Sequence, residues 1–148
     1  MFRFGSRSRE TMVGVHPDLI LVAGRALSKS EVDISVMEGL RDIQQQRINV
    51  QKGVSKTLDS YHITGDALDL GAYVDNAISW DMRYYFDIAY AMRDAAIELG
   101  IRIKWGGGWF VLNDSHDLVA SLEAYEQRKK DQKKKPFIDG PHFQRERR

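Results

Sequence analysis

The sequence contains no cysteine. This absence excludes disulfide scaffolds, thiol nucleophiles and zinc sites with thiolate ligands, so any metal site must use imidazole and carboxylate groups. No unbroken apolar stretch reaches the length of a signal peptide or a membrane span. We therefore expect synthesis in the cytoplasm without a signal peptide and no stable insertion into a membrane.

The formal net charge of +1 hides a strong asymmetry along the chain. Residues 128 to 148 carry nine Lys and Arg against three Asp and Glu, a net charge of +6, which leaves −5 for the rest. Such a tail suits nucleic acid, anionic lipid, an anionic cell-wall surface or simply a solvated helix end. No aromatic residue interrupts Arg128 to Lys135, and no familiar nucleic-acid-binding signature occurs, so we expect no nucleic-acid partner.

The length of 148 residues and the apolar fraction of 43% predict one domain, residues 1 to 148, with a single core. Helical spacing of apolar residues predicts helices from Pro17 onward, from Ser79 as N-cap to Leu99, and from Asp114 or Ser115 to about Lys134, with an exposed helix over 42–50. Strands are expected at 32–36, 67–73, 101–105 and 137–143. Together these indicate a small α+β domain with a central antiparallel sheet flanked by helices.

Two short segments carry the residues suited to chemistry. A turn at Gly65 would fold His62 back beside Asp69, while Pro141 fixes Asp139 relative to His142. Two imidazoles and one carboxylate suit a catalytic zinc, which keeps one position for water. Asp139 is placed to accept a proton from that water.

A cationic group is also needed where the attacked carbonyl oxygen becomes negative, and Arg41 is the preferred candidate. From spacing alone, a surface or hydrogen-bonded histidine remains an alternative to a ligand. His16 precedes a proline and is expected to be a capping residue, and His116 is expected at the surface. Trp105 and Trp109 suit either core packing or the lining of a cleft.

The order of the motifs resembles the zinc D-alanyl-D-alanine carboxypeptidases and, more closely, the phage L-alanyl-D-glutamate endopeptidases. The resemblance rests on segments along nearly the whole chain: Val15-His16-Pro17-Asp18-Leu19, Glu38-Gly39-Leu40-Arg41 with Gln46, Gly53-x-Ser55-Lys56-Thr57, Ser60-x-His62-x-x-Gly65-x-Ala67-x-Asp69, Trp105-Gly106-Gly107 and Asp139-x-Pro141-His142-Phe143.

This resemblance implies one zinc ion, held at the sheet by His62, Asp69 and His142. It also implies Asp139 as the catalytic base and Arg41 as the residue that polarises the scissile carbonyl or holds substrate. Gln46 and Ser55 match the substrate-binding residues of the family more loosely.

The chain departs from the phage enzymes after Trp105. Gly108 stands where they usually have an aspartate, and about 29 residues separate Trp109 from Asp139 where they proceed almost directly to the last motif. We therefore expect a helical, basic insertion at about 110–136. A lid, an element attracted to the cell wall and a passive extension all remain open as its role.

The resemblance implies a zinc metallopeptidase that cuts the L-alanyl-D-glutamate bond of peptidoglycan, an endolysin of bacteriophage type that degrades the cell wall and lyses the host. It would be made as a monomer in the host cytoplasm and act on the wall after the membrane is permeabilised. The alternatives are a D-alanyl-D-alanine carboxypeptidase or dipeptidase with the same metal site, and a non-catalytic zinc-containing binding module. Retention of both Asp139 and Arg41 disfavours the last of these.

Overall fold

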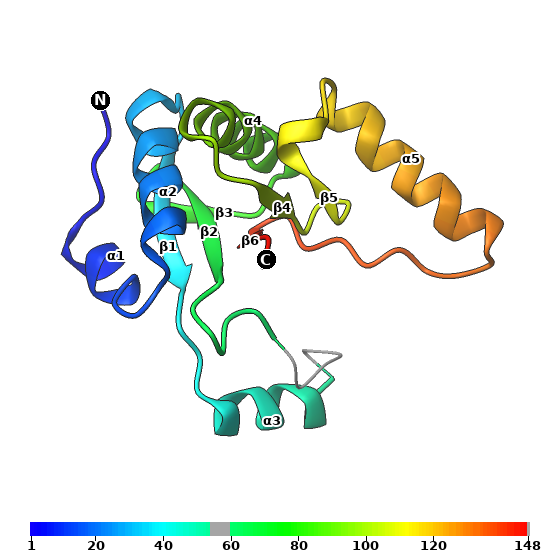
Figure 1. Cartoon of the computed structure of the whole chain (residues 1–148), viewed down its shortest axis with the longest axis horizontal. Helices are drawn as coiled ribbons and strands as arrows, with labels where there is room; N and C mark the ends of the chain where they lie inside the picture. The colour runs from blue at the N-terminus through cyan, green and yellow to red at the C-terminus, as the bar shows by residue number, and fades with distance from the viewer. Residues whose placement is uncertain (54–59, 148) are drawn as a thin grey trace.

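The computed structural model describes residues 1 to 53 and 60 to 147. Its centre is an antiparallel sheet in the order β1-β2-β6-β4-β5, with β3 paired to β2. The strands are β1 (Asp33–Glu38), β2 (Ala67–Val74), β3 (Ala77–Ser79), β4 (Ile103–Trp105), β5 (Phe110–Val111) and β6 (His142–Arg145). Helices accompany this sheet, so the predicted α+β class with an antiparallel sheet is confirmed (Figure 1).

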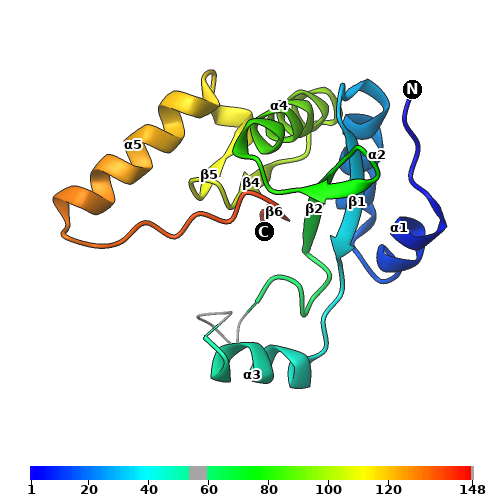
Figure 2. The same cartoon turned by 180° about the vertical axis from the view of Figure 1, so that it is seen from behind.

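Two helices pack together on one face of the sheet, α2 (Pro17–Lys29) and α4 (Met82–Leu99). Their apolar stripes bury against alternate residues of β2, including Leu68 and Leu70, which are fully buried. Asp69 lies between these two leucines and therefore points to the opposite face, as its place in the strand predicts. The face without these helices is the one that carries the candidate site (Figures 1 and 2).

The start of the long helix was predicted wrongly. Ser79 is not an N-cap but the last residue of β3, where it pairs with Ala72 across a hairpin. The side chain of Asp81 caps α4 instead, by accepting a hydrogen bond from the backbone N–H of Arg83. Trp80 is consequently outside the helix and 66% exposed, so it does not belong to the apolar stripe.

The last strand is shorter than predicted and begins at His142 rather than at residue 137. The hydroxyl of Tyr125 accepts from the backbone N–H of Phe137 and donates to its carbonyl, which removes Phe137 from any strand ladder. Three further elements were not predicted: α1 (Ser6–Thr11), β5 and the 3₁₀ turn Leu112–Asp114. All three are shorter than two helical turns or a full strand, too short for periodicity to reveal.

The expected exposed helix is α3 (Ile43–Gln51), capped by the side chain of Asp42. Gln46 is its one buried residue. The predicted substrate residue Ser55 lies outside the described residues. In the described part of the chain, no helix combines the length and apolar character needed to cross a membrane.

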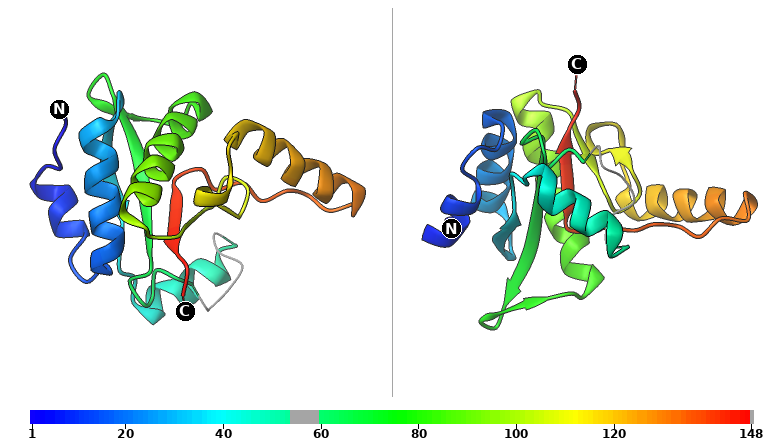
Figure 3. Two further views of the ribbon diagram at one scale, coloured as in Figure 1. Left: turned by 45° about the horizontal axis from the view of Figure 1, so that its top comes forward. Right: turned by 90° about the horizontal axis from the view of Figure 1, so that it is seen from below.

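The segment between β5 and β6 contains α5 (Leu118–Asp131), which projects away from the sheet and the other helices (Figures 1 and 3). Its inner face consists of Leu118, Leu122 and Tyr125, which are buried. It begins later and ends earlier than expected, with Asp117 as N-cap. An extended segment then returns from its far end to β6.

Candidate metal centre

Three predicted ligands meet where β2 pairs with β6. Asp69 and His142 are direct cross-strand partners, so their side chains stand on the same face of the sheet, and His62 reaches them from the loop before β2. Oδ1 of Asp69 lies 3.2 Å from Nε2 of His62 and 3.4 Å from Nδ1 of His142. One ligand atom from each of the three residues lies within 4.8 Å of the others, a spacing that suits a shared metal ion.

The outer nitrogens of both histidines are occupied by hydrogen bonds. Nδ1 of His62 lies 2.8 Å from the carbonyl oxygen of Gly39, and Nε2 of His142 lies 2.8 Å from Oε1 of Gln144. Because both oxygens only accept, these nitrogens carry hydrogens, and in the neutral imidazoles the inner nitrogens keep their lone pairs. Two lone pairs and a carboxylate thus converge, which fits a divalent metal held by imidazole and carboxylate.

Electrostatics keep the carboxylate of this cluster charged. Burial alone would raise the pKa of Asp69, but hydrogen bonds from His142 and His62 hold that pKa well below its usual range. Burial lowers the pKa of His142, whereas the hydrogen bond and charge of Asp69 raise it, with a net rise. The side chain of Asp69 therefore stays negatively charged near neutral pH.

Asp139 lies in the turn just before β6, bound through its backbone N–H to the carbonyl of Gly106 at 2.8 Å. Burial and the nearby charge of Asp69 raise the pKa of Asp139, against the opposing charges of His142, His62 and Arg41. A carboxylate with a raised pKa is a stronger proton acceptor near neutral pH than an ordinary aspartate. The predicted base thus lies beside the predicted ligands.

Gly106 lets this turn approach the sheet. A Cβ at Gly106 would lie 2.5 Å from the carbonyl oxygen of Asp139 and 2.9 Å from Cβ of His142. The backbone N–H of Gly106 also donates to the carbonyl of His142 at 2.8 Å. The glycine after Trp105 therefore sets the spacing between Asp139 and His142.

Gly65 forms the turn that positions His62, the first of the candidate ligands. Its φ of 75° is left-handed, and a Cβ there would lie 2.4 Å from the carbonyl oxygen of Gly14. The turn that it forms brings His62 back towards β2, as the sequence predicts. The backbone N–H of Arg41 bonds the carbonyl of His62 at 3.0 Å, which joins this turn to the segment after β1.

The guanidinium of Arg41 is held by two neighbours. Nε and Nη2 donate to the two carboxylate oxygens of Glu38 at 2.5 and 2.6 Å, and Nη1 donates to the side chain of Gln46. Burial lowers the pKa of Arg41, but the hydrogen bonds and charge of Glu38, with the charges of Asp69 and Asp139, raise it overall. Three of its five N–H donors are used in this way, which leaves two for a substrate.

Sequence reasoning overlooked several residues that support the site. Gln144 is buried and bonds His142, and its position two residues further along a strand was the available signal, since it places both side chains on one face. Glu38 was matched to a motif but given no role. Trp109 was not overlooked, since core packing and the lining of a cleft were both left open for it. Its ring lies 5.3 Å from that of His142, so this tryptophan borders the cluster.

His16, His116 and Trp105 behave as expected. His16 caps α2 by accepting from the backbone N–H of Asp18, and His116 is exposed. Trp105 is fully buried and donates to the carbonyl of Gly140, so it is a core residue that also supports the turn of Asp139. None of these three is a ligand candidate.

Comparison with known proteins identifies similar chains. A family described as phage L-alanyl-D-glutamate peptidase matches residues 1 to 145. The L-alanyl-D-glutamate peptidase of Escherichia phage T5 is 37% identical over 122 residues, which cover 80% of this chain and 89% of that protein. The enzyme of the same name from Listeria phage A118 is 31% identical over 94 residues, which cover 64% of this chain and 32% of that protein.

A solved structure shares the fold. The crystal structure of Serratia marcescens L-Ala D-Glu endopeptidase ChiX superposes with a TM-score of 0.74 and 41% sequence identity. The superposition covers 98% of this chain and 90% of that one. It therefore takes in the segment that contains α5 as well as the sheet.

Proposed function

Because the chain belongs to the phage L-alanyl-D-glutamate peptidase family, we propose that it hydrolyses the bond between L-alanine and D-glutamate in bacterial peptidoglycan. The observation that carries this proposal is the convergence of His62, Asp69 and His142 beside Asp139. Such a set of ligands with an adjacent base suits hydrolysis of an amide bond.

The metal in this proposal is one zinc ion, held by Nε2 of His62, Oδ1 of Asp69 and Nδ1 of His142. The donor set supports it, since two imidazoles and one carboxylate are typical of catalytic zinc and leave a position open. When bound, zinc supplies a Lewis acid that polarises the scissile carbonyl and brings the pKa of a water molecule to about 7.

Asp139 carries the proton in this mechanism. Its carboxylate accepts a proton from the attacking water and delivers it to the nitrogen of D-glutamate as the amide bond breaks. The raised pKa of Asp139 favours the first transfer, because an ordinary aspartate would bind the proton too weakly near neutral pH. The products are a free L-alanine carboxylate and a free D-glutamate amine.

Arg41 stabilises the negative charge that forms on the carbonyl oxygen. Glu38 holds two of its N–H groups and Gln46 a third, so the remaining donors are fixed in direction before substrate arrives. Preorganised donors of this kind contribute about 3–4 kcal/mol to the transition state. Gln46 is fully buried, so it acts here by orienting Arg41.

Action on the wall of a host cell follows from this assignment. The protein works as a monomer on peptidoglycan, its macromolecular partner, after another protein has opened the inner membrane. The outcome is lysis of the host, as expected of an endolysin.

The decisive experiment is mass spectrometry of purified peptidoglycan after incubation with the protein, with chelator and with zinc added back. New L-alanine carboxyl ends and D-glutamate amino ends that vanish with chelator and return with zinc are the expected result. Release of D-alanine alone would instead indicate a D-alanyl-D-alanine carboxypeptidase. Absence of any cleavage would indicate a zinc-containing binding module.

A further inference from the structure

Six cations crowd the far end of α5 and the residues after it. Arg128, Lys129, Lys130, Lys133, Lys134 and Lys135, here called the basic tip, are accompanied within 128–135 by a single acid, Asp131. All but Lys129 are exposed, and Lys129 lies over the ring of Tyr125 at 5.7 Å. Across the described part of the chain, none of the six forms an ion pair. Their positive charge is therefore available to a partner.

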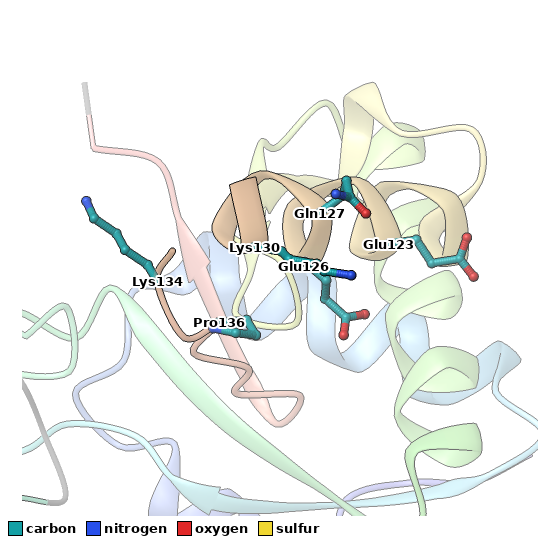
Figure 4. Close-up of a pocket in the computed structure, with 6 residues that line it drawn as sticks. All are labelled: Glu123, Glu126, Gln127, Lys130, Lys134 and Pro136. Carbon is teal, nitrogen blue, oxygen red and sulfur yellow. The ribbon is translucent and has the colours of Figure 1, made fainter. Parts of the chain in front are cut away.

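The charge of α5 changes along its length. Glu123, Glu126, Gln127, Lys130, Lys134 and Pro136 line a hollow beside the helix, with Glu123 at one end of this group and Lys134 at the other (Figure 4). An anion is repelled by the glutamates near the body of the protein and attracted towards the projecting end. Figure 3 shows that this end stands clear of the sheet and of the other helices.

A short segment connects the basic tip to Asp139, the proposed catalytic base. The hydroxyl of Tyr125 binds both backbone groups of Phe137. The carbonyl of Phe137 also accepts a hydrogen bond from Nε1 of Trp109 at 2.8 Å, and the rings of these two residues stack. Only three residues separate Lys135 from Asp139, so their Cα atoms are at most about 14 Å apart. A polymer bound at the site therefore passes within reach of the tip.

We propose that the basic tip binds carboxylates of peptidoglycan stem peptides next to the stem being cut, and so holds the enzyme on its polymer. This inference rests on the proposed function. A glutamate residue has two carboxyl groups and continues a peptide through one, so each stem that contains D-glutamate keeps a carboxylate free. The wall thus presents repeated anions, and a second attachment raises the effective concentration of the polymer at the site.

Nucleic acid is a poorer fit to the same surface. Tyr125 is the only aromatic residue between Leu118 and Lys135, and it is buried. No ring is thus exposed on α5 for stacking on bases, which single-stranded nucleic-acid sites normally provide. A polymer that carries carboxylates needs only the positive charges of the basic tip in order to bind.

Lys133 offers a variant that removes charge without weakening the helix end. It adopts a left-handed conformation with φ 56°, and its N–H bonds the carbonyl of Lys130. Glycine is favoured at such a position after a helix, so Lys133→Gly should not lower the thermal midpoint. Loss of binding in this variant would therefore reflect the missing charge.

The test measures co-sedimentation with intact peptidoglycan sacculi stripped of attached polymers, using full-length protein with Asp139→Asn so that the sacculi survive. The variants are Lys133→Gly alone and Lys133, Lys134 and Lys135→Gln together. The matched control is Arg3, Arg7 and Arg9→Gln, which removes the same charge from exposed positions in and before α1, at the opposite end of the molecule from α5 (Figure 1). Each is measured from 25 to 300 mM salt.

The lysine triple variant should bind sacculi at least about tenfold more weakly at low salt, and the difference should shrink as the Debye length falls to about 8 Å. The single variant should lie between wild type and the triple, and the arginine control within about twofold of wild type. Equal losses in the two triples, or no loss in either, would overturn the proposal. Competition by duplex DNA that is stronger than competition by soluble stem peptides would overturn peptidoglycan as the partner.

A parallel assay separates this inference from the proposed function. In the background with Asp139 intact, the lysine triple should cleave a short soluble stem peptide at the wild-type rate, since that substrate is too small to need a second attachment. Failure of the wild-type protein to cleave it would refute the proposed function, whatever the sedimentation shows. A lysine triple that loses cleavage of the short peptide would overturn the role of the tip as a remote attachment.

Discussion

Oε1 of Gln144 lies 2.8 Å from Nε2 of His142, on the side of the ring away from Asp69. This contact holds the hydrogen on Nε2 and leaves Nδ1 free to bind a metal. Outer hydrogen bonds of this kind orient metal-binding histidines, and their loss typically weakens metal affinity by about 10–100-fold. Gln144→Leu should therefore bind zinc about 10–100-fold more weakly, as measured by competition with a chelating dye. Gln144→Glu keeps an acceptor and should restore the affinity, and equal affinity in all three proteins would refute this role.

Replacing Asp139 should lower the rate of peptide cleavage without changing metal binding. Asp139→Asn keeps the shape of the side chain but cannot accept a proton, so the rate of peptide cleavage should fall by about 10²–10⁴-fold. The zinc content, measured by metal analysis after dialysis, should match that of the wild type, since Asp139 is not one of the three ligands. Cleavage within about tenfold of wild type would contradict the assignment.

Gly106 and Gly24 form a matched pair for testing whether the backbone around Asp139 needs a glycine beside it. At Gly106 a Cβ would clash with the carbonyl of Asp139, so Gly106→Ala should destabilise the fold by about 1–3 kcal/mol and reduce activity. Gly24 lies inside α2 with nothing within 4 Å of its Cβ position. Gly24→Ala should thus stabilise the fold by about 0.5–1 kcal/mol with unchanged activity. Urea unfolding of both variants measures the difference, and a Gly106→Ala variant as stable as the wild type would show that the clash is relieved.

Among the described residues, an arginine contacts both carboxylate oxygens of a glutamate at two places, at the site between Arg41 and Glu38 and on the surface between Arg25 and Glu98. Lysine cannot reproduce the planar fork of arginine. Arg41→Lys should lower kcat by about 10²-fold if its free donors stabilise the transition state. Arg25→Lys should leave kcat within about twofold. Steady-state kinetics on a soluble stem peptide distinguish the two, and a change in KM alone at Arg41 would indicate substrate holding instead.

The cluster of side chains around Asp66 should make the stability of the fold sensitive to acid. Burial raises the pKa of Asp66, but hydrogen bonds from Thr64, Arg145 and Arg147 lower it overall. A carboxylate with a lowered folded pKa stabilises the protein above its unfolded pKa of about 3.9, and that stability is lost as pH falls through the folded value. The thermal midpoint should therefore fall between pH 5 and pH 2.

Asp66→Asn tests this dependence. The variant should be less stable at pH 7 by about 1–3 kcal/mol, because two arginines lose a charged partner. Its thermal midpoint should also change less with pH than that of the wild type. Glu123→Gln, on the exposed face of α5, serves as the control and should follow the wild-type curve. Parallel curves for Asp66→Asn and the wild type would rule out Asp66 as the source.

The candidate ligands were predicted from the resemblance to a peptidase family, and the local geometry of their segments agreed with it. Gly65 after His62 and Pro141 before His142 mark turns, and the alternation of β2 places Asp69 away from the core. The supporting contacts were less accessible, because they join residues distant in the sequence. The approach of Gly106 to Asp139 and the bond from Trp105 to Gly140 depend on how β4 packs against the turn before β6, which no local pattern encodes.

The errors in the fold have similar physical causes. Ser79 has the right chemistry for an N-cap, but Asp75 and Asn76 adopt left-handed conformations and turn the chain into a hairpin that takes Ser79 into β3. Phe137 and Ile138 have the composition of a strand, yet Tyr125 binds both backbone groups of Phe137. In each case a partner elsewhere in the chain overrides the local preference.

Asp69 and His142 are neighbours across two strands but lie far apart in the sequence, with α4, β4 and α5 between them. Forming the site therefore requires a long loop to close, a step that is slow in folding because its entropy is lost before the strands pair. A partly synthesised chain lacks His142, one of the three candidate ligands, and should be inert. Peptidase activity therefore depends on completed folding, and a metal that binds only the folded state would stabilise that state.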